Sequence, residues 1–458
     1  MIQVKLRKFH PGMLEAASRA GRICREPEIP GDDGKVINVK EHLFEVGHHT
    51  TIQTADHWLG FDIEGIAIGD VDFGLHLAGP FYVSLQRSGR LCGGMFESPN
   101  ISQVKDYVRC FWPDVNERNI ERIAAFVKRS AEIYAENLPR AVAKVEEMIR
   151  VERPHASAQY IKLNAPKIAQ EQLRTVFPVA LLTALYYSIN LSTLVALYKV
   201  AWSPVMKAVT QMMVEEVLKV EPALSFMFSR GSIEWSPRMP SAIIDCLSKP
   251  KNEILTSDIY FRDFLEKVVL PEPESVFPID TLNFDPRFMG NDMVRINCFL
   301  HISLAFLGQN QRHRTIERGA PAFTGYYYLP PILVKLGLGD TMGSIMEEWL
   351  RLSWDLPQSL SSILAPYGAM VEFENSGSIN GFLHELGKRT CFCAQEEAYH
   401  ATRSFLRELS VKVKDKGNLL RRHFAPVCVL TGECGEGARY CRRDLKKVAE
   451  DPFPDRSV

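Results

Sequence analysis

Two arginines and a histidine stand on successive residues in the segment 309–314, which reads QNQRHR. The planar donors of Arg312, His313 and Arg314 suit phosphates and flat heterocycles. The residues before this segment, 302–307, are mostly apolar, so the triplet follows a buried element rather than a solvated loop. We therefore expect a binding site here. A basic helix end that pairs with a carboxylate is the alternative.

Two further polar motifs lie far from this triplet. Residues 86–90 read QRSGR, and near the C-terminus Arg389 is followed by the sequence AQEE at residues 394–397. Together the motifs resemble those of the flavin-dependent thymidylate synthases. That family combines an Arg-His-Arg triplet, a Ser-Gly-Arg motif, and a helix that ends in a catalytic arginine before an Ala-Gln-x-Glu turn.

The matching motifs are divided between the two halves of the chain. After the triplet, the family's serine slot holds Ala322 and its arginine slot holds Thr324, whereas the triplet slot before QRSGR reads AGP at residues 78–80. Each half keeps what the other has lost. The resemblance therefore implies two tandem thymidylate synthase-like units, residues 1–232 and 233–458, that build one composite site.

The resemblance also implies a role for each matching residue. Arg389 takes the place of the catalytic arginine. Arg174, four residues before Pro178, matches a substrate-binding arginine, whose slot in the second half is Ser362 before Pro366. The residues expected to bind the substrate are Gln86, Ser88, Arg90, Arg174, Gln309 and Arg312. Those expected to bind the cofactor are Arg312, His313, Arg314, His48 and Thr50 of the sequence GHHT, and Asn190.

The implied reaction is methylation of a pyrimidine nucleotide at C5, from dUMP to dTMP or a close variant. FAD, NADPH and methylenetetrahydrofolate are the implied cofactors, and a homodimer would form a pseudo-tetramer. Gln86 stands where the family has a glutamate, and an amide differs from a carboxylate in its donors. Another C5 modification, such as hydroxymethylation, therefore remains an alternative, as does a non-catalytic protein that binds flavin or nucleotide.

Length and composition fit a globular protein of two or three domains. The chain has 458 residues, of which 46% are hydrophobic, and a net charge of -1. We therefore expect no nucleic-acid polymer as partner, no membrane association, and a cytoplasmic location. Residues 175–198 carry no charge and are long enough to cross a bilayer, but Pro178 and Asn190 within them favour two buried elements of a globular core.

The fold class that we expect is α+β with long helical insertions. Hydrophobic spacing predicts strands at residues 2–6, 61–68, 81–85 and 296–304. It predicts a helix pair over residues 116–151, or one long helix kinked at Pro139, and further helices at 204–218 and 332–360. No glycine-rich loop of the dinucleotide or P-loop type is present, so any pyrophosphate must be held by side chains.

The ten cysteines show no pattern of an oxidised scaffold. His423, Cys428, Cys434 and Cys441 have spacings that one zinc ion would bridge, with unpaired thiols in an irregular tail as the alternative. We expect Cys391 and Cys393 to pack rather than react, and we expect no thiolate attack on the pyrimidine.

Overall fold

The computed structural model describes most of the chain. The described residues are 1–9, 12–15, 58–87, 93–231, 233–249, 268–269, 286–311, 314–412, 424–426, 428–429, 432–434 and 440–458, with Ser18, Arg22, Lys35, Asn38 and Lys414. They contain both helices and β-sheets, so the prediction of an α+β fold is confirmed.

The chain divides into two compact units, and neither is one continuous stretch. Unit 1 contains Met1–Arg87, Asp106–Asp114 and Leu182–Ser236. Unit 2 contains Ser88–Lys105, Val115–Leu181 and Pro237–Val458. Residues 115–181 lie in the first half of the sequence but pack with the second half.

Unit 1 is built on an antiparallel sheet with the strand order β1-β2-β4-β3. Its strands are β1 (Gln3–Lys8), β2 (Trp58–Ala67), β3 (Tyr82–Gln86) and β4 (Leu182–Asn190). Apolar residues alternate along β2 and β4 and meet across the pair: Leu59 lies opposite Ile189, and Phe61 lies opposite Tyr187. This period of two puts one face of each strand into the core.

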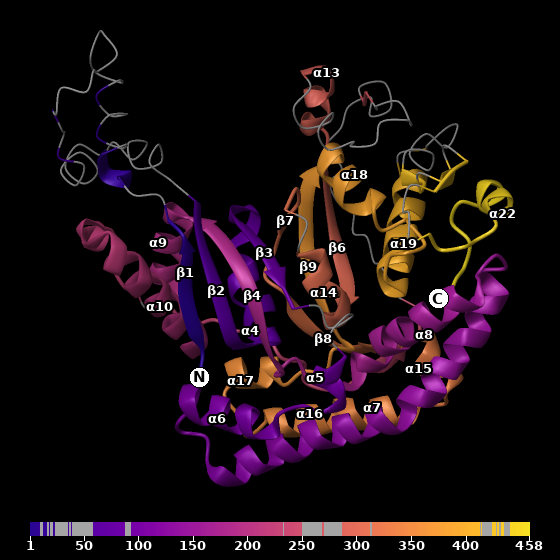
Figure 1. The fold of residues 1–458 in the computed structure, drawn as a ribbon, viewed down its shortest axis with the longest axis horizontal. Coiled ribbons are helices and arrows are strands. Elements are labelled where there is room, and N and C mark those ends of the chain that lie inside the picture. Colours follow the sequence, from indigo (N-terminus) through magenta and orange to yellow (C-terminus); the bar gives the residue numbers. More distant parts are fainter. Residues whose placement is uncertain are drawn as a thin grey trace. The chain divides into compact units, whose positions relative to one another are not determined.

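Helices α9 (Leu191–Val200) and α10 (Pro204–Val220) follow β4 directly and complete unit 1 (Figure 1). The uncharged segment 175–198 therefore contains two separate elements, as predicted, and these are a strand and a helix rather than one continuous helix. In the part of the chain that the structure describes, no helix is long and apolar enough to span a membrane.

Unit 2 is built on a mixed sheet with the order β5-β8-β9-β6, in which β7 also pairs with β9. Its strands are β5 (Asp245–Leu247), β6 (Arg295–Ser303), β7 (Glu317–Arg318), β8 (Ala322–Tyr328) and β9 (Ala369–Ser378). Helices α18 (Ile379–Gly387) and α19 (Glu396–Lys412) bury Phe382, Phe405 and Leu409 against Ile296 and Cys298 of β6. Their apolar residues recur at helical spacing, which explains the packing.

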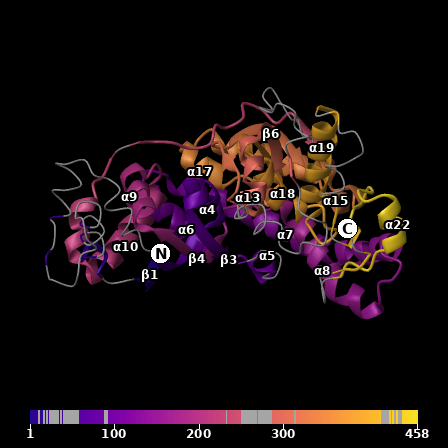
Figure 2. The same ribbon diagram turned by 90° about the horizontal axis from the view of Figure 1, so that it is seen from above.

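A second helical layer of unit 2 comes from both halves of the sequence. It consists of α7 (Glu117–Glu152), α8 (Ala158–Leu173), α15 (Pro331–Lys335), α16 (Gly339–Ser353) and α17 (Gln358–Ile363). Helix α7 packs on α8 and α16, and α15 lies beside α8 (Figures 1 and 2). Residues 117–152 form a single helix with Pro139 inside it, and the predicted helical insertion 332–360 consists of three helices.

The two sheets share a common order of three strands. The order β2-β4-β3 of unit 1 corresponds to β6-β9-β8 of unit 2, and both sets are antiparallel. In each, the first strand leads straight into a short helix, α4 (Ile68–Asp72) or α14 (Leu304–Asn310). In each, the central strand ends on the N-cap of the next helix, Asn190 or Ser378.

Inside unit 2, the segments that precede the two central strands pair with each other. Pro178 and Pro366 form an antiparallel bridge. The N–H of Val179 donates to the carbonyl of Ala365 at 2.9 Å, and the N–H of Tyr367 donates to the carbonyl of Phe177 at 2.6 Å. The two bonds are reciprocal, as they are in any antiparallel bridge.

Candidate functional site

Arg389 and Gln309 form one polar pair in unit 2. Arg389 follows the C-terminal end of α18, where its backbone N–H donates to the carbonyl of Leu386. Its Nη2 donates to the carbonyl of Gln309 at 2.8 Å, and its Nη1 lies 3.4 Å from the Oε1 of the same glutamine. The guanidinium also lies over the ring of Phe306, 5.8 Å from its centroid. The predicted catalytic arginine and a predicted substrate-binding residue are thus in contact.

Arg174 comes from the first half of the sequence and lies against the same helix as Gln309. Its Nη2 is 3.4 Å from the carbonyl of Ala305, in α14, and its guanidinium lies over the ring of Tyr367 at 5.2 Å. Arg174 is buried, and its Nε hydrogen-bonds to no residue that the structure describes. A buried guanidinium with an unpaired donor is suited to an anionic ligand.

The AQEE turn clamps α14 at both ends. At the start of the helix, Glu397 accepts hydrogen bonds from the backbone N–H of Ser303 at 2.7 Å and from its hydroxyl at 2.5 Å. Ser303 is the N-cap of α14. At the other end, the side-chain amide of Gln309 donates to Gln395, which in turn lies 3.5 Å from Glu397. Burial raises the pKa of Glu397 to about 7.

Several predicted site residues lie outside the described residues: Arg312, His313, Ser88, Arg90, His48 and Thr50. Arg314 is described and follows α14 by four residues. Gln86 is the last residue of β3 in unit 1. Asn190, predicted to contact the cofactor, is the N-cap of α9, where its Oδ1 accepts from the N–H of Thr193 at 2.9 Å.

A buried polar network that the motifs did not reveal lies beside the Arg389–Gln309 pair. Asn310 donates to Glu385 Oε1 at 2.5 Å. The guanidinium of Arg318, on β7, donates from Nε to Asn310 Oδ1 at 2.7 Å and from Nη2 to Glu385 Oε2 at 2.5 Å. Burial raises the pKa of Glu385, while Arg318 opposes that shift. Each of the three side chains bonds both of the others.

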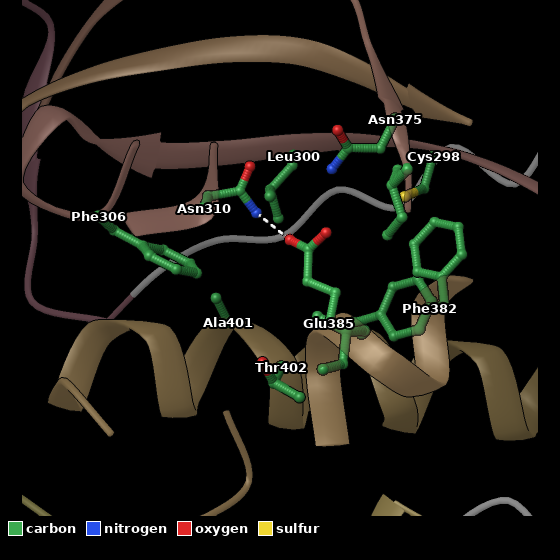
Figure 3. A pocket seen from close by; sticks show the side chains of 12 residues that line it. Cys298, Leu300, Phe306, Asn310, Asn375, Phe382, Glu385, Ala401 and Thr402 are labelled. Carbon is green, nitrogen blue, oxygen red and sulfur yellow. Dashed lines mark hydrogen bonds between the residues drawn. The ribbon is translucent and has the colours of Figure 1, made fainter. Parts of the chain in front are cut away.

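The network borders a small cavity between the sheet and helices α18 and α19 (Figure 3). Its wall is mostly apolar, with Phe306, Phe382 and Leu300 among the lining residues, and Asn375 reaches in from β9. The cavity has room for about 20 Å³, enough for a group the size of water and too little for a nucleobase. It therefore belongs to the support of the site rather than to the ligand pocket.

The described cysteines lie partly together but do not form an ion site. Cys393 and Cys441 pack with Phe392 and Tyr399, and the backbone N–H of Cys393 lies 3.5 Å from the sulfur of Cys391. Burial first, and then neighbouring thiols, raises the pKa of Cys428 to about 12. His423 lies outside the described residues; among those described, no three His, Cys, Asp or Glu side chains are arranged to hold a metal ion.

Comparison with known proteins returns matches only among solved structures. The sequence matches no family model and no curated protein. Two crystal structures of the flavin-dependent thymidylate synthase of Helicobacter pylori, both described as complexes with FAD and dUMP, match at 18% identity with a TM-score of 0.31 and at 16% identity with a TM-score of 0.33. Each match covers 50% of this chain and 98% of the other chain. Because these scores are low, the function proposed below rests on this chain's own residues.

Proposed function

We propose that this chain is an enzyme that alkylates a pyrimidine nucleotide at C5 with FAD as cofactor, at one site that both halves of the sequence build. The observation that carries the proposal is the contact of Arg174 with α14, the helix whose far end holds Gln309 against Arg389. These are the residues that the family motifs single out, and they come from sequence positions more than 130 residues apart. Convergence of matched residues is a stronger argument for a site than fold likeness.

The chemistry of the donors fits a nucleotide. Arg174 offers a buried cation with an unpaired Nε for the phosphate. Arg389 carries a permanent charge, and next to the pyrimidine ring it would stabilise the negative charge that develops as C5 becomes nucleophilic. Gln309 holds this guanidinium in place, so little reorganisation is needed when the nucleotide binds. Ser88, Arg90 and Gln86 would complete the contacts to the nucleotide.

The flavin, when bound, supplies the reducing equivalents of the reaction. The family resemblance assigns Arg312, His313 and Arg314 to flavin binding, and likewise His48, Thr50 and Asn190. NADPH as reductant and methylenetetrahydrofolate as one-carbon donor are part of the same proposal. Arg314, four residues after the end of α14, places one of these cations on the segment that Arg389 and Gln309 anchor.

Two sequence repeats, residues 1–232 and 233–458, explain the shared topology of the two sheets. The common strand order supports this part of the proposal, and Pro178 lies opposite Pro366, the residue at the matching motif position of the second half. A homodimer of such chains would resemble a tetramer of single units. Light scattering of the purified protein tests it: a mass of two chains is expected, and a strictly monomeric protein that turns over would contradict it.

Complementation of a thymidine-requiring strain tests the reaction. If dUMP is the substrate, the gene restores growth without thymidine, and the Arg389→Ala variant does not. If another pyrimidine nucleotide is modified, as the glutamine at position 86 allows, the strain fails to grow while the purified enzyme converts a different nucleotide in vitro. A protein that binds flavin and nucleotide but converts no pyrimidine nucleotide would establish the non-catalytic alternative instead.

A further inference from the structure

The contact of Gln309 with Arg389 is one of two neighbouring polar contacts between the end of α14 and the region of α18. Gln309 and Asn310 are neighbours at the end of α14. Glu385 precedes Arg389 by four residues, one helical turn, so the two side chains lie on the same side of α18 and the loop that continues it. The Gln309–Arg389 pair and the Asn310–Glu385 pair are therefore two neighbouring hydrogen-bonded pairs that join the same elements.

Arg318 joins the Asn310–Glu385 pair to a third element, strand β7. Its fork bonds Asn310 through Nε and Glu385 through Nη2, and its Nη1 donates to the carbonyl of Ile316 at 3.1 Å. The side chain of Arg318 is 12% exposed and that of Glu385 1% exposed. A planar, bidentate cation in a buried setting fixes distance and angle together, which a point charge does not.

The surroundings of the Asn310–Glu385 pair favour a structural role for these residues over ligand binding. Every oxygen of Glu385 and the amide oxygen of Asn310 is already bonded within the network. The adjoining cavity is too small for a nucleobase, and its lining is mostly apolar apart from Asn375 and Thr402. Figure 3 shows Glu385 turned toward Asn310 and away from Thr402.

We propose that Arg318, Asn310 and Glu385 form a positioning network that sets the distance between Gln309 and Arg389 for catalysis. This inference rests on the proposed function for its kinetic part. The residues touch neither substrate nor cofactor. They act through α14 and α18, and a displacement of Arg389 by about 1 Å would cost about 100-fold in turnover.

Three variants separate positioning from simple stability. Arg318→Leu leaves the Glu385 carboxylate buried without its cation and is expected to destabilise the protein strongly. Arg318→Leu with Glu385→Leu removes both charges and is expected to unfold at a higher temperature than the single variant. Arg318→Lys keeps the charge but cannot hydrogen-bond to Asn310 and Glu385 at the same time. It is expected to unfold at a higher temperature than Arg318→Leu.

The proposal expects kcat to fall about 100-fold in the folded double variant and in Arg318→Lys, with a smaller change in KM. The matched control is the exposed neighbouring ion pair of Arg295 and Glu317, replaced by leucine at both positions, which should leave kcat unchanged. Wild-type kcat in the double variant would overturn the positioning role.

A crystal structure of the double variant decides the inference even if no nucleotide is turned over. The account expects the hydrogen bond between Arg389 Nη2 and the Gln309 carbonyl to be broken or lengthened. Retention of that bond at its present 2.8 Å would overturn the inference. Absence of turnover by the wild type would instead overturn the proposed function, so the two failures are distinguishable.

Discussion

Arg389 is the residue on which the proposed chemistry depends most. Its guanidinium is held by two contacts to Gln309 and lies over Phe306, so it is oriented before any ligand binds. Lys388, the residue before Arg389, is exposed and makes a suitable control. The neighbouring cations thus differ in exposure and in contacts while sharing their charge.

Replacing Arg389 by lysine should lower kcat by about 100- to 1,000-fold, because lysine keeps the charge but not the planar donors. Flavin content, measured from the absorption of the purified protein, should remain that of the wild type. Lys388→Ala should lose neither. Wild-type activity in Arg389→Lys together with a loss in Lys388→Ala would mean that local positive charge, and not the oriented guanidinium, is what matters.

Asn190 tests how far a motif match can be carried over. In the structure its side chain caps α9 through Thr193. Asn190→Ala should therefore lower the free energy of unfolding by about 1 kcal/mol, whereas Asn190→Ser should retain most of the cap. If the serine variant keeps its stability in urea denaturation but loses flavin, Asn190 has the cofactor role in addition to the cap.

Motifs found some residues of the site and missed others for a physical reason. Arg174, Gln309 and Arg389 were found because each stands at a fixed offset from a recognisable neighbour. Arg318 and Glu385 were missed because a buried ion pair between residues 67 positions apart leaves no periodic signal in the sequence. Only the fold brings β7 against α18.

Helix α14 is the element that the site is built on. Glu397 holds its first turn through Ser303, and Gln395 and Arg389 hold its end. The carboxyl of Glu397 is fully buried, and burial raises its pKa from 4.5 to about 7. The protonation of this one group therefore affects the stability of the whole element.

The sign of the pH effect follows from the raised pKa. Between pH 4.5 and about 7 the folded protein retains a proton on Glu397 that the unfolded chain has released, so the free energy of unfolding falls as pH rises through this window. The loss amounts to about 3 kcal/mol above pH 7. Glu397→Gln keeps an acceptor and a donor for Ser303 without a titrating group.

Urea denaturation of the two proteins at pH 5 and pH 8 measures this difference. From pH 5 to pH 8, the free energy of unfolding of Glu397→Gln should rise relative to that of the wild type by about 3 kcal/mol. The control is Glu374→Gln, at an exposed position of β9, which should show no such change. A stability difference that is the same at both pH values would mean that the Glu397 carboxyl is already ionised in the folded protein at pH 5.

Strands whose apolar and polar residues alternate were predictable, and strands without that alternation were not. The strands β1, β2, β3 and β6 were found from their patterns. β8 reads AFTGYYY and β9 contains the polar residues Glu372, Glu374 and Asn375, so neither shows a simple alternation of apolar and polar residues. The position of β9 in the middle of its sheet comes from pairing with β6 and β8, which are distant in sequence.

At the scale of the whole molecule, the compact units and the proposed repeats do not coincide. Helices α7 and α8 come from residues 1–232 but pack in unit 2, where Tyr134 and Phe177 form an aromatic cluster with Phe96. The cluster continues to Tyr367, from the second repeat. No local sequence pattern could predict that α7 and α8 pack with the second half of the sequence, because an amphipathic helix has the same pattern wherever it packs.

A fragment of residues 233–458 alone should therefore fail to unfold cooperatively, because it lacks the helices that cover its core. Co-expression with residues 1–232 should restore a soluble complex that co-purifies on a tag carried by either fragment. Thermal denaturation followed by circular dichroism makes the comparison. A sharp transition of the isolated fragment, matching that of the whole chain, would show that residues 233–458 fold without α7 and α8.

In the proposed function, Arg174 from the first half of the sequence and Arg389 from the second serve one nucleotide site beside a bound flavin. Titration of the FAD-loaded protein with dUMP, followed by the flavin absorption spectrum, tests it most directly. The account predicts a saturable spectral change in the wild type and in Lys388→Ala, and at least a tenfold weaker affinity in both Arg174→Ala and Arg389→Ala. A protein that takes up no FAD, or an Arg174→Ala variant that binds dUMP as the wild type does, would contradict it.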